Sequence, residues 1–404
     1  MIKWSFSGSG NNYDCYWIND ILSVETIDLQ GKTIDLNSLK IKSGIDFSLQ
    51  RLLSEHLPDN IKQGMLFISR GDELVACAGL QWIDFNFHSY LNPETDSGSS
   101  AIRNLCKRVL HKMGSVFNGK ILVLGQLVVP GMKTSWISDE IPGQMKEHWW
   151  ERALDHLVSD TIDFSNIELS AVAVVHSGNS PNSSKTRPFA SWHSYRIEPV
   201  MEIGNLTKWK KFDHYRSSLR SKYRKKINAV LKKSPSLEIR EMTTEDIHRH
   251  RERIMYLFNR LLSSSTYNLV SPQFEFFREL IDVPDLDYHI SGIFEGDRLL
   301  AFYSWFQYGT TTEGHYLGYD PADLQRYDLY KLILIQLLKQ ALNSGSERLY
   351  LGRTATVVKA DLGARSIPSF VSIKPIGWKR SKLLPVYYQM FYRPGNLRNR
   401  NVFK

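Results

Sequence analysis

The chain repeats one pattern in its two halves, a helix-like stretch followed by two apolar strands around an acidic Gly-Asp turn. In the first half, Phe47–Leu57 has helical spacing, and Met65–Trp82 (MLFISRGDELVACAGLQW) has the composition of a hairpin. In the second half, Ile247–Leu262 and Tyr288–Phe306 (YHISGIFEGDRLLAFYSWF) follow in the same order. Apolar runs on both sides of such a turn are typical of a β-hairpin, and a repeat of this kind indicates a duplicated unit. Because strand–Gly-Asp–strand is a common local pattern, a chance match is the alternative.

The segments after each hairpin predict further strands and, in the second half, a long helix. Strands are predicted at 120–129, 167–175, 310–319 and 348–351, and a helix at 327–343 that stops at Asn343-Ser344-Gly345. A strand, a helix and a strand in this order indicate a crossover between parallel strands. Ser177–Arg187 (SGNSPNSSKTR) has the composition of a linker. The sequence therefore predicts an α/β (α+β) chain of two domains, 1–195 and 196–404.

Composition and motifs exclude several classes of protein. The 404 residues are 42% hydrophobic and 23% charged, which is ordinary for a globular protein. No apolar run reaches the roughly 18 residues of a membrane helix, and the N-terminus lacks the apolar core of a secretory signal. The three cysteines, Cys15, Cys77 and Cys106, are too sparse for a disulfide framework. We expect a cytoplasmic protein, and the absence of HExxH, CxxC, P-loop and GxGxxG patterns predicts no metal site.

Positive charge is concentrated in two segments of the chain. Lys208–Lys233, called here the basic segment, holds eleven basic residues and one acid, so it needs a counter-charge. Its apolar residues recur at steps of three and four, which predicts one amphipathic helix. The basic side would bind a polyanion, such as a nucleotide diphosphate, a transfer RNA, a lipid headgroup or an anionic membrane. The candidate binding residues are Arg220, Lys222, Arg224 and Lys225. The alternative is an ordinary solvated helix face.

The second basic segment is the tail Trp378–Lys404, with seven basic residues and no acid. We predict that Lys379–Tyr392 forms a final strand on the second domain. Its basic and aromatic residues suggest a second possibility, an anchor at a membrane interface. The aromatic residues of that anchor would be Trp378, Tyr387, Tyr388, Phe391 and Tyr392.

Candidate site residues gather between 313 and 364. On the predicted strand, Glu313 and His315 share one face and could act as base or polar anchor, although an edge strand with a solvated polar face would look the same. Beyond the strand, Tyr319, Arg326 and Tyr327 lie where a helix N-terminus could hold an anion. Asp323 and Asp328 could instead be simple helix caps.

A strand followed by a Gly-Arg-Thr turn leads to a lysine six residues after the arginine. Arg353 could bind a carboxylate or phosphate with its guanidinium. Lys359 could stabilise a developing oxyanion as a point charge. The two cations therefore predict a site for an anionic group beside a developing oxyanion.

Three segments resemble the tandem GNAT-related acyltransferases, especially the Fem-type or FemAB-like group. They are Tyr215–Lys226 (YRSSLRSKYRKK), the strand–helix stretch Tyr316–Gly345, and LGRTATVVKADLGA from Leu351. The resemblance implies two tandem GNAT-like α/β domains, each with a mixed β-sheet flanked by helices. Fem enzymes transfer an aminoacyl group from transfer RNA to an amine of a peptidoglycan precursor, and relatives use acyl-CoA. The implied donor is therefore acyl-CoA, an acyl carrier or aminoacyl-tRNA, and the implied acceptor is an amine.

One functional residue is carried across by the resemblance. Val358-Lys359 followed by Leu362-Gly363 looks like the position of the family's important lysine, although Val358 stands where an aromatic residue is frequent. The pyrophosphate loop of ordinary GNAT enzymes, Arg/Gln-x-x-Gly-x-Gly/Ala, is absent, because no glycine follows Gly318 before the helix. A long coiled-coil arm is absent too. We therefore weigh an N-acyltransferase working by direct amine attack against a non-catalytic module that binds RNA or another polyanion. A third possibility is a membrane-surface enzyme that acts on a lipid amine.

Overall fold

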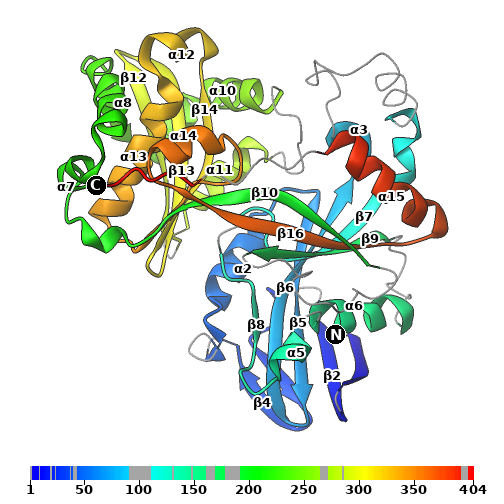
Figure 1. Ribbon diagram of the computed structural model, residues 1–404. Helices are drawn as coiled ribbons and strands as arrows, with labels where there is room; N and C mark the ends of the chain where they lie inside the picture. Colours follow the sequence, from blue (N-terminus) through cyan, green and yellow to red (C-terminus); the bar gives the residue numbers. More distant parts are fainter. Residues whose placement is uncertain are drawn as a thin grey trace. The chain divides into compact units, whose positions relative to one another are not determined.

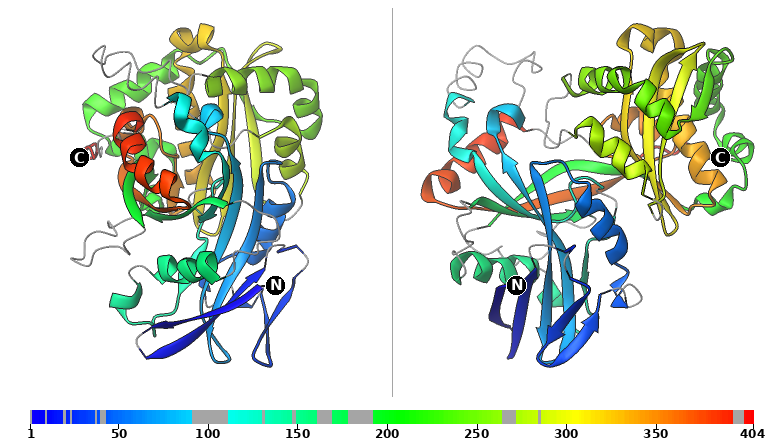
Figure 2. Two further views of the ribbon diagram at one scale, coloured as in Figure 1. Left: turned by 90° about the vertical axis from the view of Figure 1, so that its right-hand side faces the viewer. Right: turned by 180° about the vertical axis from the view of Figure 1, so that it is seen from behind.

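The computed structural model divides the chain into two compact units (Figure 1, Figure 2). The first consists mainly of Met1–Ile197 and Ser369–Arg393, and the second mainly of Glu198–Ser265, Pro272–Pro368 and Pro394–Lys404. The structure describes residues 2–8, 10–18, 21–22, 24–36, 38–39, 43–90, 111–129, 132–146, 149–160, 169–177, 192–263, 272–283, 286–392 and 399–404. The domain division at 195/196 stays a prediction, and most of the linker Ser177–Arg187 lies outside the described residues.

The first unit is built on a mixed sheet with the strand order β1-β2-β5-β6-β7-β9-β16. Neighbouring strands are antiparallel except β7 and β9, which are parallel, and β8 adds a second partner to β6. The strands are β1 (Ile2–Gly8), β2 (Asn11–Ile18), β5 (Ile61–Arg70), β6 (Glu73–Phe85), β7 (Gly119–Leu124), β8 (Ser135–Ile137), β9 (Leu169–Ser177) and β16 (Arg365–Pro375), with β3 (Thr26–Leu29) and β4 (Lys32–Asp35) as a separate hairpin. Its helices are α2 (Phe47–Glu55), α3 (Phe87–Tyr90), η2 (Gly114–Phe117), α5 (Gly143–Lys146), α6 (Trp149–Asp160) and α15 (Trp378–Phe391).

The second unit has a sheet of the order β10-β15-β14-β13-β12-β11. Only β14 and β15 are parallel neighbours. The strands are β10 (His193–Ile203), β11 (Glu238–Glu241), β12 (Tyr288–Glu295), β13 (Arg298–Tyr308), β14 (Thr311–Tyr319) and β15 (Arg348–Tyr350). The helices are η4 (Leu206–Lys208), α7 (Phe212–Ser218), α8 (Ser221–Lys232), α9 (Thr244–Arg249), α10 (Arg251–Ser263), α11 (Phe274–Ile281), α12 (Pro321–Tyr327), α13 (Leu329–Asn343) and α14 (Thr356–Asp361).

The two units repeat one topology. A hairpin (β5–β6 or β12–β13) pairs with an antiparallel third strand, which pairs with a parallel fourth strand, which pairs with an antiparallel fifth. The fifth strands are exchanged along the chain: β10 follows the first half but pairs with β15, and β16 follows the second half but pairs with β9. The predicted α/β fold of two mixed-sheet units is confirmed.

The hairpin turns show the duplication in residue detail. Gly71 and Gly296 have φ of +63° and +58°, in the left-handed region where glycine has no steric penalty. The turns join Arg70 to Glu73 and Glu295 to Arg298. In both hairpins the register shifts just after an isoleucine, Ile68 or Ile293, three residues before the turn glycine. The equal offset of the bulge in both hairpins is what a duplicated unit predicts.

Helix α13 forms the centre of the second unit's core. Leu332, Ile333, Leu337 and Leu338 are all buried, so the helix is apolar on most of its surface. Such a helix is stable only when other elements cover it on several sides. Strands β13, β14 and β15 and helices α7, α8 and α12 pack against it. Figure 1 shows these helices around the strands of the second unit. No helix among the described residues is long and apolar enough to cross a membrane.

Two predicted elements were wrong, and a third is confirmed with a start two residues later than expected. The basic segment is not one helix, because the backbone is extended at Leu219 between α7 and α8, where Phe403 bridges Leu219 and Val402 accepts a hydrogen bond from Arg220 N. The tail forms helix α15 of the first unit and not a strand on the second domain. The helix expected at 327–343 begins at Leu329, since Asp328 has φ of +52° and separates it from α12.

Candidate functional site

The two parallel strands of the second unit, β14 and β15, are hydrogen-bonded to each other over only a short length. Strand β14 continues to Tyr319, but it pairs with β15 only from Thr311 to Glu313. Strand β15 ends at Tyr350, and the chain then turns through Gly352 into helix α14. Beyond Glu313, β14 therefore has no hydrogen-bonded neighbour on the β15 side among the described strands, and the carboxyl ends of parallel strands are where α/β proteins place ligands.

Lys359 lies next to this point. It is on α14, its side chain is buried with 3% exposure, and a Cβ atom placed on Gly352 would lie 3.9 Å from Lys359 Nζ. Burial alone lowers the pKa of Lys359 from 10.5 to about 7, because the charged form loses its hydration. The amine is therefore present in both charged and neutral forms near neutral pH. The prediction from sequence placed this lysine in a strand-to-loop motif, but the structure places it on a short helix.

The start of α14 is conformationally unusual. Ala355 has φ of +54°, a left-handed conformation that a residue with a Cβ rarely adopts. The turn is fixed from both sides, since Gly352 O accepts a hydrogen bond from Met201 N at 3.0 Å and Ala355 O accepts one from Lys359 N at 3.3 Å. Backbone strain of this kind persists where the surroundings hold it, and it is frequent at functional sites.

Arg353 lies in the same turn but is held by the backbone of β10. Its Nη1 donates to Glu198 O at 2.7 Å, and the side chain is partly buried. This bond uses one of the five N–H groups that an arginine carries. The structure thus places Arg353 and Lys359 on the same turn–helix connection after β15.

Glu313 belongs to a group of acids and phenols on four strands, β10, β13, β14 and β15. It is 2% exposed, and its Oε2 accepts a hydrogen bond from Tyr308 Oη at 2.7 Å. Tyr350 is its registered partner on β15, and Glu202 is the partner of Tyr350 on β10. Burial and the Glu202 carboxylate raise the pKa of Tyr350 to about 12, and burial and Glu313 raise that of Tyr308. The sequence pattern singled out Glu313 but gave no signal for its three partners.

His315 lies in an aromatic group on the same strand. Its ring centroid is 4.8 Å from that of Phe306 and 5.6 Å from that of Tyr288, and Nδ1 is 3.4 Å from Tyr288 Oη. Phe306 is also the registered partner of Glu313. Glu313 and His315 therefore both lie next to Phe306. This agrees with the prediction that they share one face of their strand.

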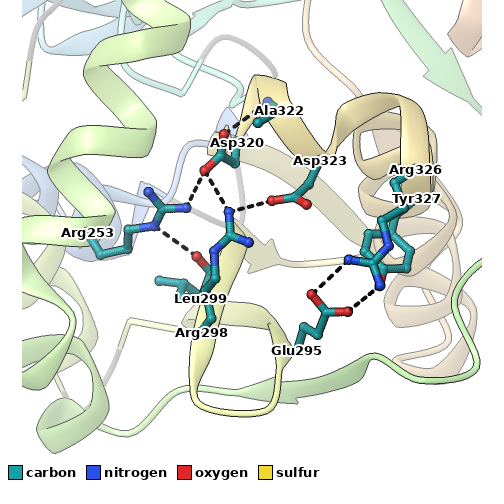
Figure 3. A network of polar contacts seen from close by, with 9 residues as sticks. All are labelled: Arg253, Glu295, Arg298, Leu299, Asp320, Ala322, Asp323, Arg326 and Tyr327. Atoms are coloured by element: carbon teal, nitrogen blue, oxygen red, sulfur yellow. Dashed lines mark hydrogen bonds and ion pairs between the residues drawn. The ribbon is translucent and has the colours of Figure 1, made fainter.

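The N-terminal end of α12 is occupied by the protein's own carboxylates (Figure 3). Asp320 caps the helix by accepting from Ala322 N at 3.0 Å, and it also accepts from Arg253 Nη2 at 2.5 Å and Arg298 Nη2 at 3.3 Å. Asp323 accepts from the same Arg298 at 2.7 Å. Although burial alone raises the pKa of Asp320, the hydrogen bonds from Arg253 and Ala322 lower it below its usual value. The helix start that the sequence placed near Arg326–Asp328 is preceded in the structure by α12, whose own start at Pro321 is capped by Asp320.

Two of the predicted donor-binding residues make intramolecular contacts beside this cluster. Arg326 Nη2 forms an ion pair with Glu295 at 2.8 Å, and Tyr327 Oη donates to the same carboxylate at 2.5 Å (Figure 3). Tyr319 lies at the end of β14, with its ring 6.1 Å from Tyr330. Tyr319 thus lies on the part of β14 beyond its pairing with β15. Arg326 and Tyr327 both contact Glu295 at the end of β12.

In the basic segment, the two predicted binding arginines make hydrogen bonds within the protein, whereas the two predicted binding lysines are exposed. Arg220 Nε donates to Phe403 O at 2.9 Å, and Arg224 Nη1 donates to Leu219 O at 3.0 Å. Lys222 and Lys225 are exposed on α8 and can contact an external anion.

The basic segment also contacts the helix that carries Lys359. Asp361 of α14 forms ion pairs with Lys226 of α8 and with Arg400 near the C-terminus. Tyr215 of α7 donates a hydrogen bond to Leu362 O. These contacts fix α14 through residues that are far apart in sequence, so spacing alone gave no signal for them.

No group of three or more His, Cys, Asp or Glu side chains that could hold a metal ion is present in the part of the chain that the structure describes.

Comparison with known proteins identifies the region around Lys359. Residues 217–360 match the family model of the acetyltransferase (GNAT) domain, so the predicted resemblance to GNAT-related acyltransferases is confirmed for this part of the chain. No curated protein matches the sequence. Among solved structures, FemX is 9% identical, covering 91% of this chain and 96% of its own, with a TM-score of 0.43. L-PGS from Bacillus licheniformis is 10% identical (89% and 96%, TM-score 0.42), and a tandem GNAT protein from the clavulanic acid biosynthesis pathway is 9% identical (81% and 87%, TM-score 0.42).

Proposed function

We propose that the second unit, which carries a GNAT domain over residues 217–360, transfers an acyl or aminoacyl group from an activated anionic donor to an amine. The observation that carries the proposal is the buried amine of Lys359 beside Gly352, at the point where β15 ends. Burying a charged lysine without an opposite charge beside it lowers the stability of the folded protein. Residues whose pKa is shifted in this way are frequent at functional sites. The donor is acyl-CoA, an acyl carrier or aminoacyl-tRNA.

The transfer proceeds by direct attack in a ternary complex. The nitrogen lone pair of the acceptor amine forms a bond with the acyl carbon, and the carbonyl electrons move to the oxygen. The protonated form of Lys359 stabilises this oxyanion. Collapse of the tetrahedral intermediate breaks the ester or thioester bond, and the leaving oxygen or sulfur takes the electron pair. Glu313 or His315 accepts the proton that the nucleophilic nitrogen loses.

Two features bear on the donor. The carboxylates of Asp320 and Asp323 occupy the start of α12, which disfavours a pyrophosphate bound there as in ordinary GNAT enzymes. The exposed Lys222 and Lys225 on α8 favour a donor with several phosphates. Among the three donor classes, these features support aminoacyl-tRNA best, with Arg353 as an additional anion contact.

The pH dependence distinguishes the role of Lys359. Its pKa of about 7 means that the protonated, oxyanion-stabilising form is lost as the pH rises through 7. We expect kcat/KM to fall on the alkaline side with an apparent pKa near that value. The measurement is deacylation of acetyl-CoA or of charged transfer RNA with hydroxylamine as a generic amine acceptor, followed as hydroxamate. A rate that only rises through this range would instead assign Lys359 as the base.

Charge removal on α8 tests the donor. We expect the Lys222→Gln/Lys225→Gln double variant to raise the KM for charged transfer RNA and leave kcat unchanged. The slope of log affinity against log salt should decrease by about 2, since each lysine contacts one phosphate. The matched control is Lys32→Gln/Lys62→Gln, which removes two exposed lysines from the first unit. Equal effects of the two double variants would contradict a specific donor surface on α8.

The second candidate is a non-catalytic module that binds RNA or another polyanion through the basic segment. The internal anion at Asp320 favours it, because a lost donor site would be filled in this way. The same reagents separate the two functions. Salt-sensitive RNA binding without hydroxamate formation from any donor class would support the module over the transferase.

A further inference from the structure

Helix α15 of the first unit has one packed face and one exposed face. Leu383, Tyr387 and Phe391 recur every four residues and pack against Phe87 and Phe117. The ring of Tyr387 is 5.2 Å from that of Phe87 and 4.7 Å from that of Phe117. This face fixes the helix on the unit, so its opposite face has a defined position.

Backbone contacts reinforce this attachment. Arg380 donates through Nε to Val116 O at 2.7 Å and through Nη2 to Asn118 O at 3.3 Å. Tyr388 donates to Arg196 O at 2.7 Å. Three of the aromatic residues predicted to anchor a membrane, Tyr387, Tyr388 and Phe391, are thus used for packing inside the unit.

The exposed face combines a large aromatic ring with lysines. Trp378 is 68% exposed and Val386 is 43% exposed, and Lys379, Lys382 and Gln389 are exposed with them. Residues 378, 382 and 386 lie one above another on a helix, so these side chains form one stripe. The Nζ atoms of Lys379 and Lys382 are 5.8 and 5.7 Å from the Trp378 ring.

We propose that this stripe binds the surface of an anionic lipid bilayer. An indole has an apolar body and one N–H donor, which suits the boundary between headgroups and acyl chains. The two lysines can extend from the ring to lipid phosphates, while their stems stay in apolar surroundings. No acidic residue occurs from Trp378 to the C-terminus, so the segment supplies no internal counter-charge. The charge complementarity selects an anionic bilayer over a neutral one.

The binding surface and the transfer site can be tested separately. The stripe belongs to the first unit, whereas Lys359 and the basic segment belong to the second. Loss of lipid binding therefore leaves the proposed transferase activity on soluble substrates unaffected, and failure of the transferase proposal leaves this one standing.

Flotation of the full-length protein with vesicles tests the proposal. The protein should float with vesicles of equal phosphatidylcholine and phosphatidylglycerol, less so as salt rises, and should stay behind with phosphatidylcholine alone. Lys379→Gln/Lys382→Gln should lower the partition coefficient about fivefold per lysine. Trp378→Ala should also lower the partition coefficient, because the indole ring is lost from the interface. Quenching by brominated phosphatidylcholine in mixed vesicles should be weaker for Trp378→Phe than for the wild type.

Two controls locate the binding. Tyr256→Ala removes an exposed aromatic ring, 46% exposed, from the second unit. Lys222→Gln/Lys225→Gln removes two lysines from the basic segment. Both should float as the wild type does. Absence of flotation, flotation unchanged by the α15 variants, or flotation lost only with the Lys222/Lys225 pair would each overturn the proposal.

Discussion

Replacing Lys359 with methionine is expected to lower turnover by about two to three orders of magnitude, because the charge that stabilises the oxyanion is removed.

The same change should stabilise the protein. The pKa of Lys359 is 10.5 in the unfolded chain and about 7 in the folded protein. Between these values the unfolded chain binds more protons, so stability rises with pH in that window, and the full cost of the buried charge is present below pH 7. Lys359→Met removes this cost, on the order of 4–5 kcal/mol at neutral pH, because each pKa unit corresponds to about 1.4 kcal/mol.

Hydroxamate formation and urea unfolding of the same preparations measure both effects. The matched control is Lys339→Met on α13, a half-buried lysine whose pKa is also lowered by burial. This variant should keep wild-type turnover. A Lys359→Met protein that is active, or one that is inactive because it is less stable, contradicts the assignment.

Gly318→Ala is expected to destabilise the second unit by about 3 kcal/mol through overpacking. A Cβ on Gly318 would lie 2.7 Å from Leu257 C and 2.8 Å from Phe258 N, which are backbone atoms of α10. Backbone cannot move aside without displacing the helix from β14.

Gly314→Ala on the same strand is the matched comparison. Its Cβ would lie 2.9 Å from Leu337 Cδ1, the end of a flexible side chain. We expect a loss below about 1 kcal/mol, because a rotamer change relieves the contact. Urea unfolding of the two variants measures the difference, and equal losses would show that α10 does not cross β14 as closely as the structure has it.

The fold could be predicted from the sequence where local chemistry decides it. The glycines of the two hairpins adopt left-handed backbone, and the apolar runs around them form the strands. The repeat of the hairpin in the two halves could therefore be predicted from the sequence alone. The exchange of the fifth strands had no such signal, because it depends on which unit β10 and β16 pair with.

Long-range contacts explain the elements that were predicted wrongly. The basic segment has the periodicity of one helix, but Phe403 and Val402 pair with the backbone at Leu219 and Arg220 and interrupt it. The tail has strand-like aromatic residues, yet Tyr387 and Phe391 meet Phe87 from the other end of the chain and form a helix face.

The site was partly predictable for the same reason. Two of the proposed site residues belong to short local patterns: Lys359 was named from its residue type and from the family resemblance, and Glu313 from the alternation along its strand. The lowered pKa of Lys359 depends on its burial, and the internal anion at Asp320 depends on Arg253 and Arg298 from other elements. Neither property is encoded in local spacing.

Chemical restoration of the ammonium group tests the central claim most directly. Lys359→Cys should be inactive, and alkylation with 2-bromoethylamine should place an amine at nearly the original position. Cys15 and Cys77 are buried, and the wild type treated in the same way controls for their modification. The account predicts that hydroxamate formation returns in proportion to alkylation at residue 359, measured by mass spectrometry. A fully alkylated protein that stays inactive, or an active Lys359→Cys protein before alkylation, would contradict it.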